Sequence, residues 1–456
     1  MRILIAPSGF KESLSAGTVA AAIARGVRRV LPFARTESLP LVDGGEGSAA
    51  ALAEALGGRL VPRTTTGPVG DPVASHLALL PDGTAVVEMA ATAGLRLVPR
   101  DRRDPGLTTT YGVGELIAAA LDHGVRRVLV GCGDSGTSDG GAGALTALGA
   151  RLLDAGGREL PPGGTALARL DRIDASGLDP RLSDVELLVA CNPCNVLCGP
   201  RGVARVFGPQ KGATPERVAE LEAALERWAE ILERDVLAHR GTELGAGELR
   251  TAPGSGASGG LGAGLAALGG RLLPRFEVLL GHVDLDAKIA AADLVITAEG
   301  AIDAQTPSGK IPAEVARRAK RYGKPVLALA GTIGAGADQV HAAGIDAFES
   351  IVPGPMRLAE AIDGGEEFLV AAAERALRMV MVGARLPQAA RPRWRAESPD
   401  AARLTRAGVR EDDAAFAARK SSAVSAVDDA AFAARKGAAV DDAAARRTGR
   451  VRGMVA

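Results

Sequence analysis

Two segments of this chain share the pattern Asp-Gly-Gly-x-Gly, at residues 43–47 and 139–143. Each follows an apolar run typical of a strand and comes just before a stretch typical of a helix. Glycines let a ligand approach the backbone, and the free N–H groups and dipole at a helix start favour anions. The leading residues, Asp43 and Asp139, could be helix caps or catalytic carboxylates. The pattern predicts an anion-binding turn at two equivalent places.

A further glycine-rich loop, residues 131–136, has the spacing G-x-G-x-x-G of a dinucleotide-binding turn. Asp154 follows at roughly the distance expected of a ribose-binding acid. The signal is weak, because residues 254–259 match the same expression and residues 137–139 extend the loop before the helix begins. The phosphate-binding pattern G-x-x-x-x-G-K-[ST] does not occur in the sequence. A nicotinamide-dependent oxidoreductase stays open as an alternative function.

Lysine is rare beside arginine in this chain, so the positions that keep a lysine are informative. Lys11, Lys211 and Lys310 lie in loops of small or polar residues. A lysine ammonium is a compact charge for phosphate or carboxylate. These loops indicate an anionic substrate and a phosphate donor, although each lysine could also be an ordinary surface residue.

Glu299 and Asp303 follow a predicted strand, where ligands bind in open α/β sheets. Mg²⁺ usually takes one or two carboxylates together with phosphate oxygens. The pair is therefore a candidate Mg²⁺ site, with capping or ion pairing as the alternative. Cys191, Cys194 and Cys198 are spaced C-x₂-C-x₃-C, but zinc or an iron–sulfur cluster needs four well-placed ligands. Reduced thiols fit this spacing better.

Strands and helices alternate along most of the chain, which indicates a largely parallel α/β sheet. The predicted strands are 2–6, 37–42, 125–131, 292–298, 324–331 and 345–352, and the predicted helices include 16–30, 48–56 and 366–382. Residues 61–81 and 84–89 are β-rich. We expect two different α/β lobes: a Rossmann-like parallel sheet built from residues 1–60 and 286–384, and an inserted mixed-sheet lobe at 61–285. The glycine-rich run 254–264 could be a flexible connection.

Composition excludes several classes of function. Lys plus Arg equals Asp plus Glu, and aromatic residues make up only 3%. Neither a nucleic-acid partner nor a membrane surface is expected of such a chain. No signal peptide or membrane span is visible, so we expect a cytoplasmic protein. A homo-oligomer is compatible with the sequence, which has no pattern that specifies one.

Residues 385–456 differ from the rest of the chain. The segment DDAAFAARK occurs at 412–420 and again at 428–436. We expect a low-complexity, disordered tail, because its apolar side chains are too small to offset the entropy of ordering. A partner-binding helix, or a non-catalytic scaffold acting through this tail, stays open.

Over roughly residues 1–382 the sequence resembles the bacterial glycerate kinase family. The resemblance is carried by APSGFKESLSA, LVDGGEG, TTTYGVGEL, SDGGAGALTALGA, GPQKGATPE, ITAEGAIDAQTPSGK, LAGTIGAGA and IVPGPMRLAEA, in the family's order. It implies transfer of the ATP γ-phosphoryl group to D-glycerate, with Mg²⁺, in a cleft between two α/β lobes. Family members make the 2-phosphate or the 3-phosphate, and we favour 2-phosphoglycerate.

Phosphoryl transfer needs charge neutralisation and an aligned hydroxyl, which suggests a role for each motif. Asp139 is the first candidate for the catalytic carboxylate, and Asp43 is the second. Glycerate is assigned to Lys11, Ser13, Gly44, Gly45, Glu46 and Gly47. The ATP phosphates are assigned to Gly133, Ser135, Gly136, Thr137, Gly140, Gly141 and Lys211. Glu299 and Asp303 are assigned to the metal.

The chain also departs from the family pattern. Ser8 and Gly9 stand where the family commonly has Asp and Ser. The family segment C-D-V-D-N-P-L corresponds to residues 191–197 here, where Asn192 and Cys194 replace both acids. No carboxylate of that segment can therefore act as a base in this chain.

Overall fold

The computed structural model describes residues 1–10, 13–239, 247–280 and 284–385. These residues form a parallel sheet, a separate mixed sheet and a small antiparallel pair, β7 (Arg151–Leu153) with β8 (Arg172–Asp174). The predicted α/β fold with one parallel and one mixed sheet is confirmed. The predicted tail lies outside the described residues beyond Arg385.

The parallel sheet takes its strands from both ends of the described chain, and its order is β13-β12-β11-β1-β2. Its strands are β1 (Arg2–Ile5), β2 (Arg35–Ser38), β11 (Leu294–Ile302), β12 (Val326–Ile333) and β13 (Ala347–Ser350). Numbered as the chain enters this sheet, the order is 2-1-3-4-5, which is the flavodoxin-like form of the doubly wound fold. The order reverses between β1 and β11. Ligands of such sheets bind beyond the carboxyl ends of the strands at this reversal.

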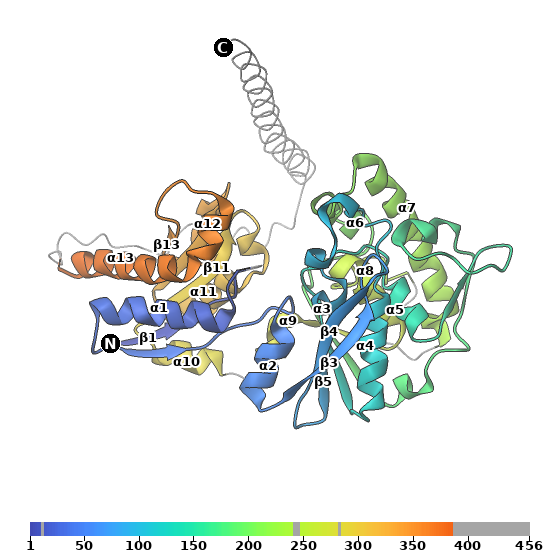
Figure 1. Cartoon of the computed structure of the whole chain (residues 1–456), viewed down its shortest axis with the longest axis horizontal. Coiled ribbons are helices and arrows are strands. Elements are labelled where there is room, and N and C mark those ends of the chain that lie inside the picture. Colours follow the sequence, from blue (N-terminus) through green and yellow to red (C-terminus); the bar gives the residue numbers. More distant parts are fainter. Residues whose placement is uncertain (11–12, 240–246, 281–283, 386–456) are drawn as a thin grey trace, which may run out of the picture. The chain divides into compact units, whose positions relative to one another are not determined.

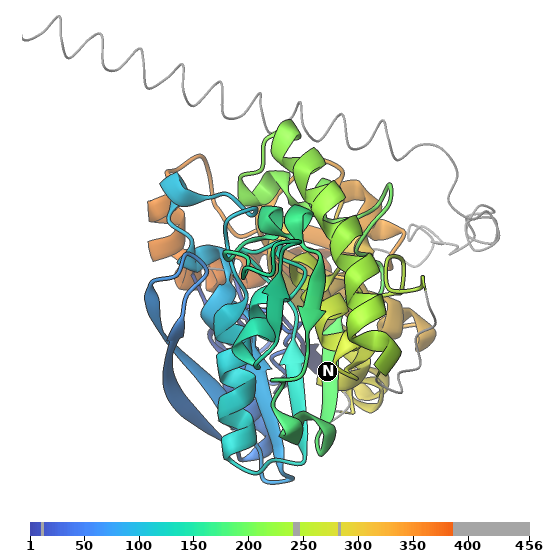
Figure 2. The same cartoon turned by 90° about the vertical axis from the view of Figure 1, so that its right-hand side faces the viewer.

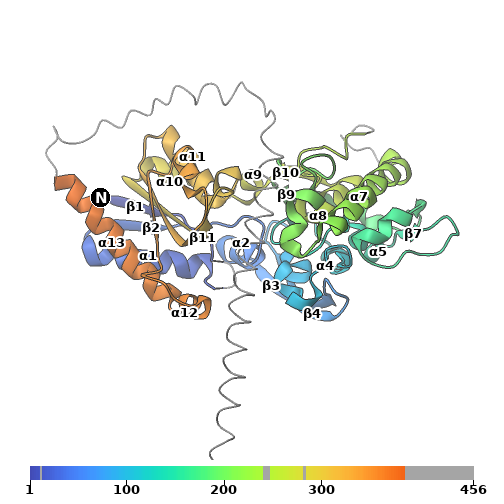
Figure 3. The same cartoon turned by 90° about the horizontal axis from the view of Figure 1, so that it is seen from above.

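Helices cover both faces of the parallel sheet (Figure 3). The helices on one face are α1 (Ala16–Val30) and α13 (Gly365–Arg385), and those on the other are α10 (Leu285–Ala291) and α11 (Ile311–Arg321). A short helix, α12 (Leu358–Asp363), precedes α13. Helices α1 and α13 pack backbone to backbone, because a Cβ on Gly26 would lie 2.4 Å from the Val370 carbonyl oxygen. The two faces bury separate apolar clusters against the strands.

The mixed sheet has the order β10-β9-β6-β5-β4-β3. Figure 1 labels its strands β3, β4 and β5, and Figure 2 shows this sheet and its helices facing the viewer. Its strands are β3 (Arg59–Thr66), β4 (Pro72–Leu79), β5 (Thr84–Glu88), β6 (Arg127–Gly131), β9 (Glu186–Cys191) and β10 (Arg271–Pro274). The first three are antiparallel neighbours, whereas β5, β6, β9 and β10 are parallel. The carboxyl ends of these four parallel strands therefore meet at one edge.

Helices also cover both faces of the mixed sheet. One face carries α4 (Tyr111–Asp122), α5 (Ala142–Ala147), α7 (Pro215–Asp235) and α8 (Ala257–Ala267), and the other carries α2 (Ser48–Leu56) and α9 (Arg275–Leu279). Two shorter helices are α3 (Ala90–Ala93) and α6 (Val203–Phe207). The domain boundaries stay predictions. Nevertheless α2, which the sequence placed with the parallel sheet, buries Leu52 in the same cluster as Ala78 and Val86 of the mixed sheet.

Two local predictions differ from the structure. The strand expected at 37–42 is shorter in the structure, where β2 covers Arg35–Ser38. The next residues still follow β1, because Leu39 N donates to the Ile5 carbonyl oxygen at 2.8 Å and Leu41 N donates to the Pro7 carbonyl oxygen at 2.9 Å. The run 254–264 is not a flexible connection, because α8 is completely buried. Its glycines serve close packing instead: a Cβ on Gly260 would lie 2.7 Å from Gly140 Cα. Within the described residues, no helix is long and apolar enough to cross a membrane.

Candidate active site

The Asp43–Gly47 turn lies directly against the loop that follows β6. A Cβ on Gly131 would be 2.8 Å from the Gly44 carbonyl oxygen, and a Cβ on Gly133 would be 2.7 Å from Gly45 N. Only glycine permits these backbone contacts. In addition, Glu46 N donates a hydrogen bond of 3.1 Å to Asp134 Oδ2. The structure thus brings together two motifs that are far apart in the sequence.

Protein carboxylates already bind three backbone N–H groups of the Asp43–Gly47 turn, and the Ser48 hydroxyl binds that of Gly44. Gly45 N donates to Asp43 Oδ1 at 3.1 Å, and Glu46 N donates to Asp134. Gly47 N and Ala49 N donate to the two carboxylate oxygens of Glu88, each at 3.0 Å. Asp134 and Glu88 therefore hold positions that the sequence offered to an anionic ligand. An anion at this turn has to be bound mainly by side chains.

Glu88 was not singled out from the sequence, although it is an acid at the end of an apolar strand, as Glu299 is. It ends β5 and is only 1% exposed. Burial raises the pKa of Glu88 to about 7, against the lowering effect of the bonds from Ala49 N and Gly47 N. The negative charges of Glu46 and Asp134 raise this pKa further. The protonation of Glu88 therefore changes the group that accepts the backbone bonds at the start of α2.

The free energy of unfolding should fall as pH rises from about 4.5 to about 7, because folded Glu88 keeps a proton that the unfolded chain releases. We expect the Glu88 contribution to be on the order of 3 kcal/mol. Urea unfolding across this range should show a flatter pH dependence in Glu88→Gln than in the wild type. Glu54 is an exposed glutamate of the same helix, so Glu54→Gln should keep the wild-type slope. Equal slopes in Glu88→Gln and wild type would contradict the prediction.

Asp139 lies in the core of the mixed lobe, by which we mean the mixed sheet with its helices. It is 0% exposed, and Thr110 donates to its Oδ2 through both N and Oγ1, each at 2.8 Å. Gly141 N and Gly143 N donate to the two Asp139 carboxylate oxygens, each at 3.1 Å. Burial raises the pKa of Asp139, whereas these bonds lower it. The carboxylate joins the starts of α4 and α5.

The residues assigned to ATP fall into two groups. Gly140 and Gly141 are buried, and the Gly140 carbonyl oxygen accepts a bond of 2.9 Å from Trp228 Nε1. Gly133 and Ser135 are partly exposed, whereas Gly136 and Thr137 are buried. Only the beginning of this loop is therefore open to a ligand.

The buried side chain of Lys211 donates hydrogen bonds to that loop. It is 2% exposed, and its Nζ donates to Ser135 Oγ at 2.9 Å and to the Thr137 carbonyl oxygen at 2.6 Å. Burial lowers the pKa of Lys211 to about 7, opposed by the negative charge of Asp139. The structure thus places Lys211 with the predicted ATP loop, as a buried support for it.

Glu299 and Asp303 come together at the carboxyl end of β11. Lys310 Nζ lies 3.5 Å from Glu299 Oε1 and 3.5 Å from Asp303 Oδ1, and it donates to the Ala301 carbonyl oxygen at 3.0 Å. The two carboxylates therefore converge on one cation. Two carboxylates facing one cationic position are a donor set that suits Mg²⁺.

Arg275 connects the Asp43 turn to the loop that carries Lys310. Its Nη1 lies 3.3 Å from both the Asp43 carbonyl oxygen and Asp43 Oδ2, and its Nη2 donates to the Gly309 carbonyl oxygen. Sequence reasoning missed this residue, because one arginine does not stand out in an arginine-rich chain. The structure therefore joins the predicted substrate turn to the predicted metal pair.

Ser13, another predicted substrate residue, lies in the segment that follows β1. Ser13 is exposed, and its N donates to the Phe10 carbonyl oxygen at 3.0 Å. Lys11 lies outside the described residues. The loop as a whole follows β1, the strand at which the order of the parallel sheet reverses.

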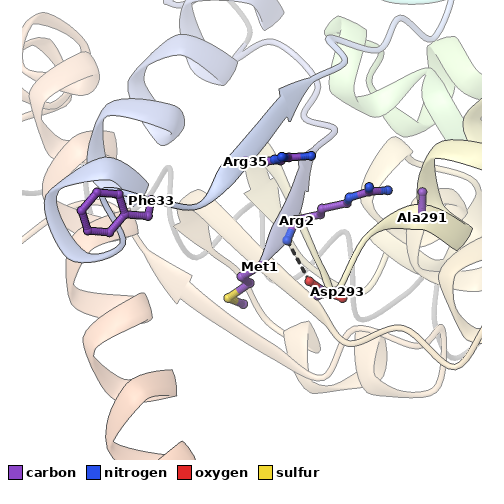
Figure 4. Close-up of a pocket in the computed structure, with 6 residues that line it drawn as sticks. All are labelled: Met1, Arg2, Phe33, Arg35, Ala291 and Asp293. Carbon is purple, nitrogen blue, oxygen red and sulfur yellow. Dashed lines mark hydrogen bonds between the residues drawn. The ribbon is translucent and has the colours of Figure 1, made fainter.

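Two other features lie outside the candidate site. A hollow of about 470 Å³ is lined by Met1, Arg2, Phe33, Arg35, Ala291 and Asp293 (Figure 4). It lies at the amino ends of β1, β2 and β11, opposite the edge where such sheets bind ligands. All four cysteines are free, and no group of three or more His, Cys, Asp or Glu in the described ranges could hold a metal.

The sequence of this chain matches known proteins over most of its length. A model of the glycerate kinase family matches residues 3–381. A glycerate kinase from Bacillus subtilis strain 168 is 47% identical over 371 residues, which cover 81% of this chain and 95% of that protein. A glycerate 2-kinase from Escherichia coli K12 is 42% identical, over 84% of this chain and 99% of that protein.

Structural comparison points to the same relationship. The crystal structure of a protein named glycerate kinase 2 from Salmonella typhimurium LT2 matches with a TM-score of 0.66 and 44% sequence identity. The match covers 85% of this chain and all of that one. Because the matched residues include both sheets and every motif placed above, the chain belongs to the glycerate kinase family and is an enzyme of the kinase class.

Proposed function

We propose that this enzyme transfers the γ-phosphoryl group of ATP to the 2-hydroxyl of D-glycerate. One observation supports this proposal most strongly: family motifs from both ends and the middle of the chain lie close together. Arg275 connects them, because it bonds to Asp43 and to the Gly309 carbonyl oxygen. The name of the Escherichia coli relative, glycerate 2-kinase, supports the position of transfer. We place the reaction in the cytoplasm, because four free thiols suit a reducing compartment.

We propose that glycerate lies beside the Asp43–Gly47 turn, with its carboxylate bound by Lys11 and Ser13. The ATP phosphates lie along the exposed start of the loop at Gly133 and Ser135. Lys211 fixes this loop through Ser135 Oγ and the Thr137 carbonyl oxygen, so it supports ATP without touching it. Positioning of this kind can supply much of the barrier reduction in phosphoryl transfer.

The geometry favours Asp43 over Asp139 as the group that accepts the hydroxyl proton. Asp43 is about one-third exposed at the surface shared by the two glycine-rich loops, whereas Asp139 is fully enclosed by four donated bonds. In the proposed step the glycerate hydroxyl oxygen attacks the γ-phosphorus and its proton passes to Asp43. The bond from the γ-phosphorus to the bridging oxygen breaks, and ADP leaves. Asp139 then holds the loop in place.

Glu299 and Asp303 are the residues that would hold Mg²⁺, since they already converge on a cation. A bound Mg²⁺ would neutralise negative charge on the phosphates. Lys310, whose ammonium lies 3.5 Å from each carboxylate, would add a second positive charge at the same place.

Glu299→Gln should raise the Mg²⁺ concentration needed for half-maximal rate by about tenfold, because a neutral amide replaces one of two anionic ligands. Initial rates at fixed ATP and glycerate, measured against Mg²⁺ concentration, would show the shift. Glu360→Gln removes an exposed carboxylate on α12 and should leave the dependence unchanged. An unshifted Mg²⁺ dependence in Glu299→Gln would remove Glu299 from the metal site.

A coupled assay of ATP consumption with D-glycerate, followed by NMR of the product, tests the proposed function directly. We expect ADP formation that depends on glycerate and a phosphorus coupling to the C2 proton. Coupling to the C3 protons would instead assign the 3-phosphate. Thermal stabilisation by NADH but not by Mg-ATP would favour an oxidoreductase. Full activity after deletion of residues 386–456 would exclude a scaffold that acts through the tail.

A further inference from the structure

Arg275 occupies a junction between three strand ends. It follows β10 directly and is the first residue of α9. Its guanidinium reaches the Asp43 carbonyl oxygen and carboxylate, which follow β2, and the Gly309 carbonyl oxygen, which lies between β11 and α11. One side chain of the mixed lobe thus contacts two loops of the parallel sheet.

The surroundings of Arg275 hold its side chain in one orientation. The side chain is 12% exposed, and its guanidinium carbon lies 4.9 Å from the centre of the Phe276 ring. Stacking on an aromatic ring and two hydrogen-bonded partners restrict a planar guanidinium much more than an ammonium group. Burying a positive charge costs desolvation free energy, which the interactions with its partners have to offset.

We infer that Arg275 is a positioning residue, which fixes the Asp43 carboxylate relative to the Gly309–Lys310 loop. Gly45 N holds Asp43 Oδ1, and Arg275 Nη1 holds Asp43 Oδ2, so the carboxylate plane is set from both oxygens. Through Gly309, Arg275 also sets the start of α11, where Lys310 faces Glu299 and Asp303. The inference rests on the proposed role of Asp43.

A positioning role predicts a particular kinetic signature. Displacement of a reacting group by about 1 Å can lower the rate about 10²-fold without weakening substrate binding. Arg275→Met should therefore lower kcat by about 10²-fold, with KM for ATP and for glycerate changed less than about threefold. Arg275→Lys keeps the charge but not the fork of donors, so it should lose an intermediate factor.

Chemical rescue separates positioning from a general loss of structure. Arg275→Ala leaves space for a free guanidinium ion, and low millimolar guanidinium should restore part of kcat, whereas methylammonium should not. Arg318 is the matched control, because its side chain is 17% exposed and paired with Asp286 and Glu314 away from the site. Arg318→Met should keep the wild-type kcat and show no response to guanidinium.

A double-mutant cycle with Asp43→Asn decides whether Arg275 acts through Asp43. If it does, Arg275→Met should cost almost nothing further in the Asp43→Asn background. Fully additive losses, or a large rise in KM for glycerate, would overturn the inference and make Arg275 a substrate ligand. Wild-type activity in Asp43→Asn would instead refute the proposed role of Asp43, so the two failures are distinguishable.

Discussion

Asp43→Asn should lower kcat by about 10²–10⁴-fold, because the amide cannot accept the proton of the attacking hydroxyl. The amide oxygen can still accept the bond from Gly45 N, but the amide NH2 group then faces Arg275 Nη1, so we expect some loss of stability with little change in substrate KM. Steady-state kinetics with varied glycerate and with varied ATP, together with a thermal unfolding curve, would separate these effects.

A matched control for Asp43→Asn is Asp71→Asn. Asp71 also pairs with an arginine, Arg102 at 2.9 Å, but on an exposed turn between β3 and β4. It should keep the wild-type kcat. An Asp43→Asn enzyme within about threefold of wild type would rule out Asp43 as the base.

Asp139→Asn should act on stability rather than on chemistry. The amide nitrogen of asparagine would face N–H donors of Thr110, Gly141 or Gly143, and at least one buried donor would lose its acceptor. Each such loss costs about 1–3 kcal/mol. We expect a lower urea midpoint, while kcat per folded enzyme stays within about threefold of wild type.

The control for Asp139→Asn is a capping aspartate at the surface. Asp284 caps α10 with a single exposed bond from Ala287 N, at 2.9 Å. Asp284→Asn should cost less than about 1 kcal/mol, because asparagine also caps helices well. A loss of kcat in folded Asp139→Asn comparable to that in Asp43→Asn would restore Asp139 as the catalytic candidate.

Local sequence patterns were sufficient to predict the first two helices of the fold. The helix predicted at 16–30 coincides with α1, because its apolar positions recur at helical spacing and Ser15 caps it. The predicted helix 48–56 coincides with α2. The strand predicted at 37–42 differs only in its bounds: β2 ends at Ser38, but Leu39 N and Leu41 N still donate to carbonyl oxygens of the β1 segment.

The sequence could not predict which residues of the candidate site are buried. The two Asp-Gly-Gly-x-Gly segments look equivalent in sequence, yet Asp43 lies at the surface and Asp139 in the core. The difference depends on Thr110 and Trp228, which reach the second turn from α4 and α7. Arg275 was missed for the same reason, since its partners are distant in the chain. No local pattern contains such contacts.

Synthesis on the ribosome separates the two parts of the parallel sheet in time. Arg2 N bonds to Asp293 Oδ2, 291 positions further along the chain. At about 5–20 residues per second, β1 and α1 wait on the order of 15–60 s for β11. The mixed sheet draws its strands from one continuous stretch, Arg59 to Pro274, so it can close during this delay. Meanwhile Ile3, Ile5 and Ile23 remain uncovered, and nascent chains are most exposed to aggregation until α13 emerges and packs on α1.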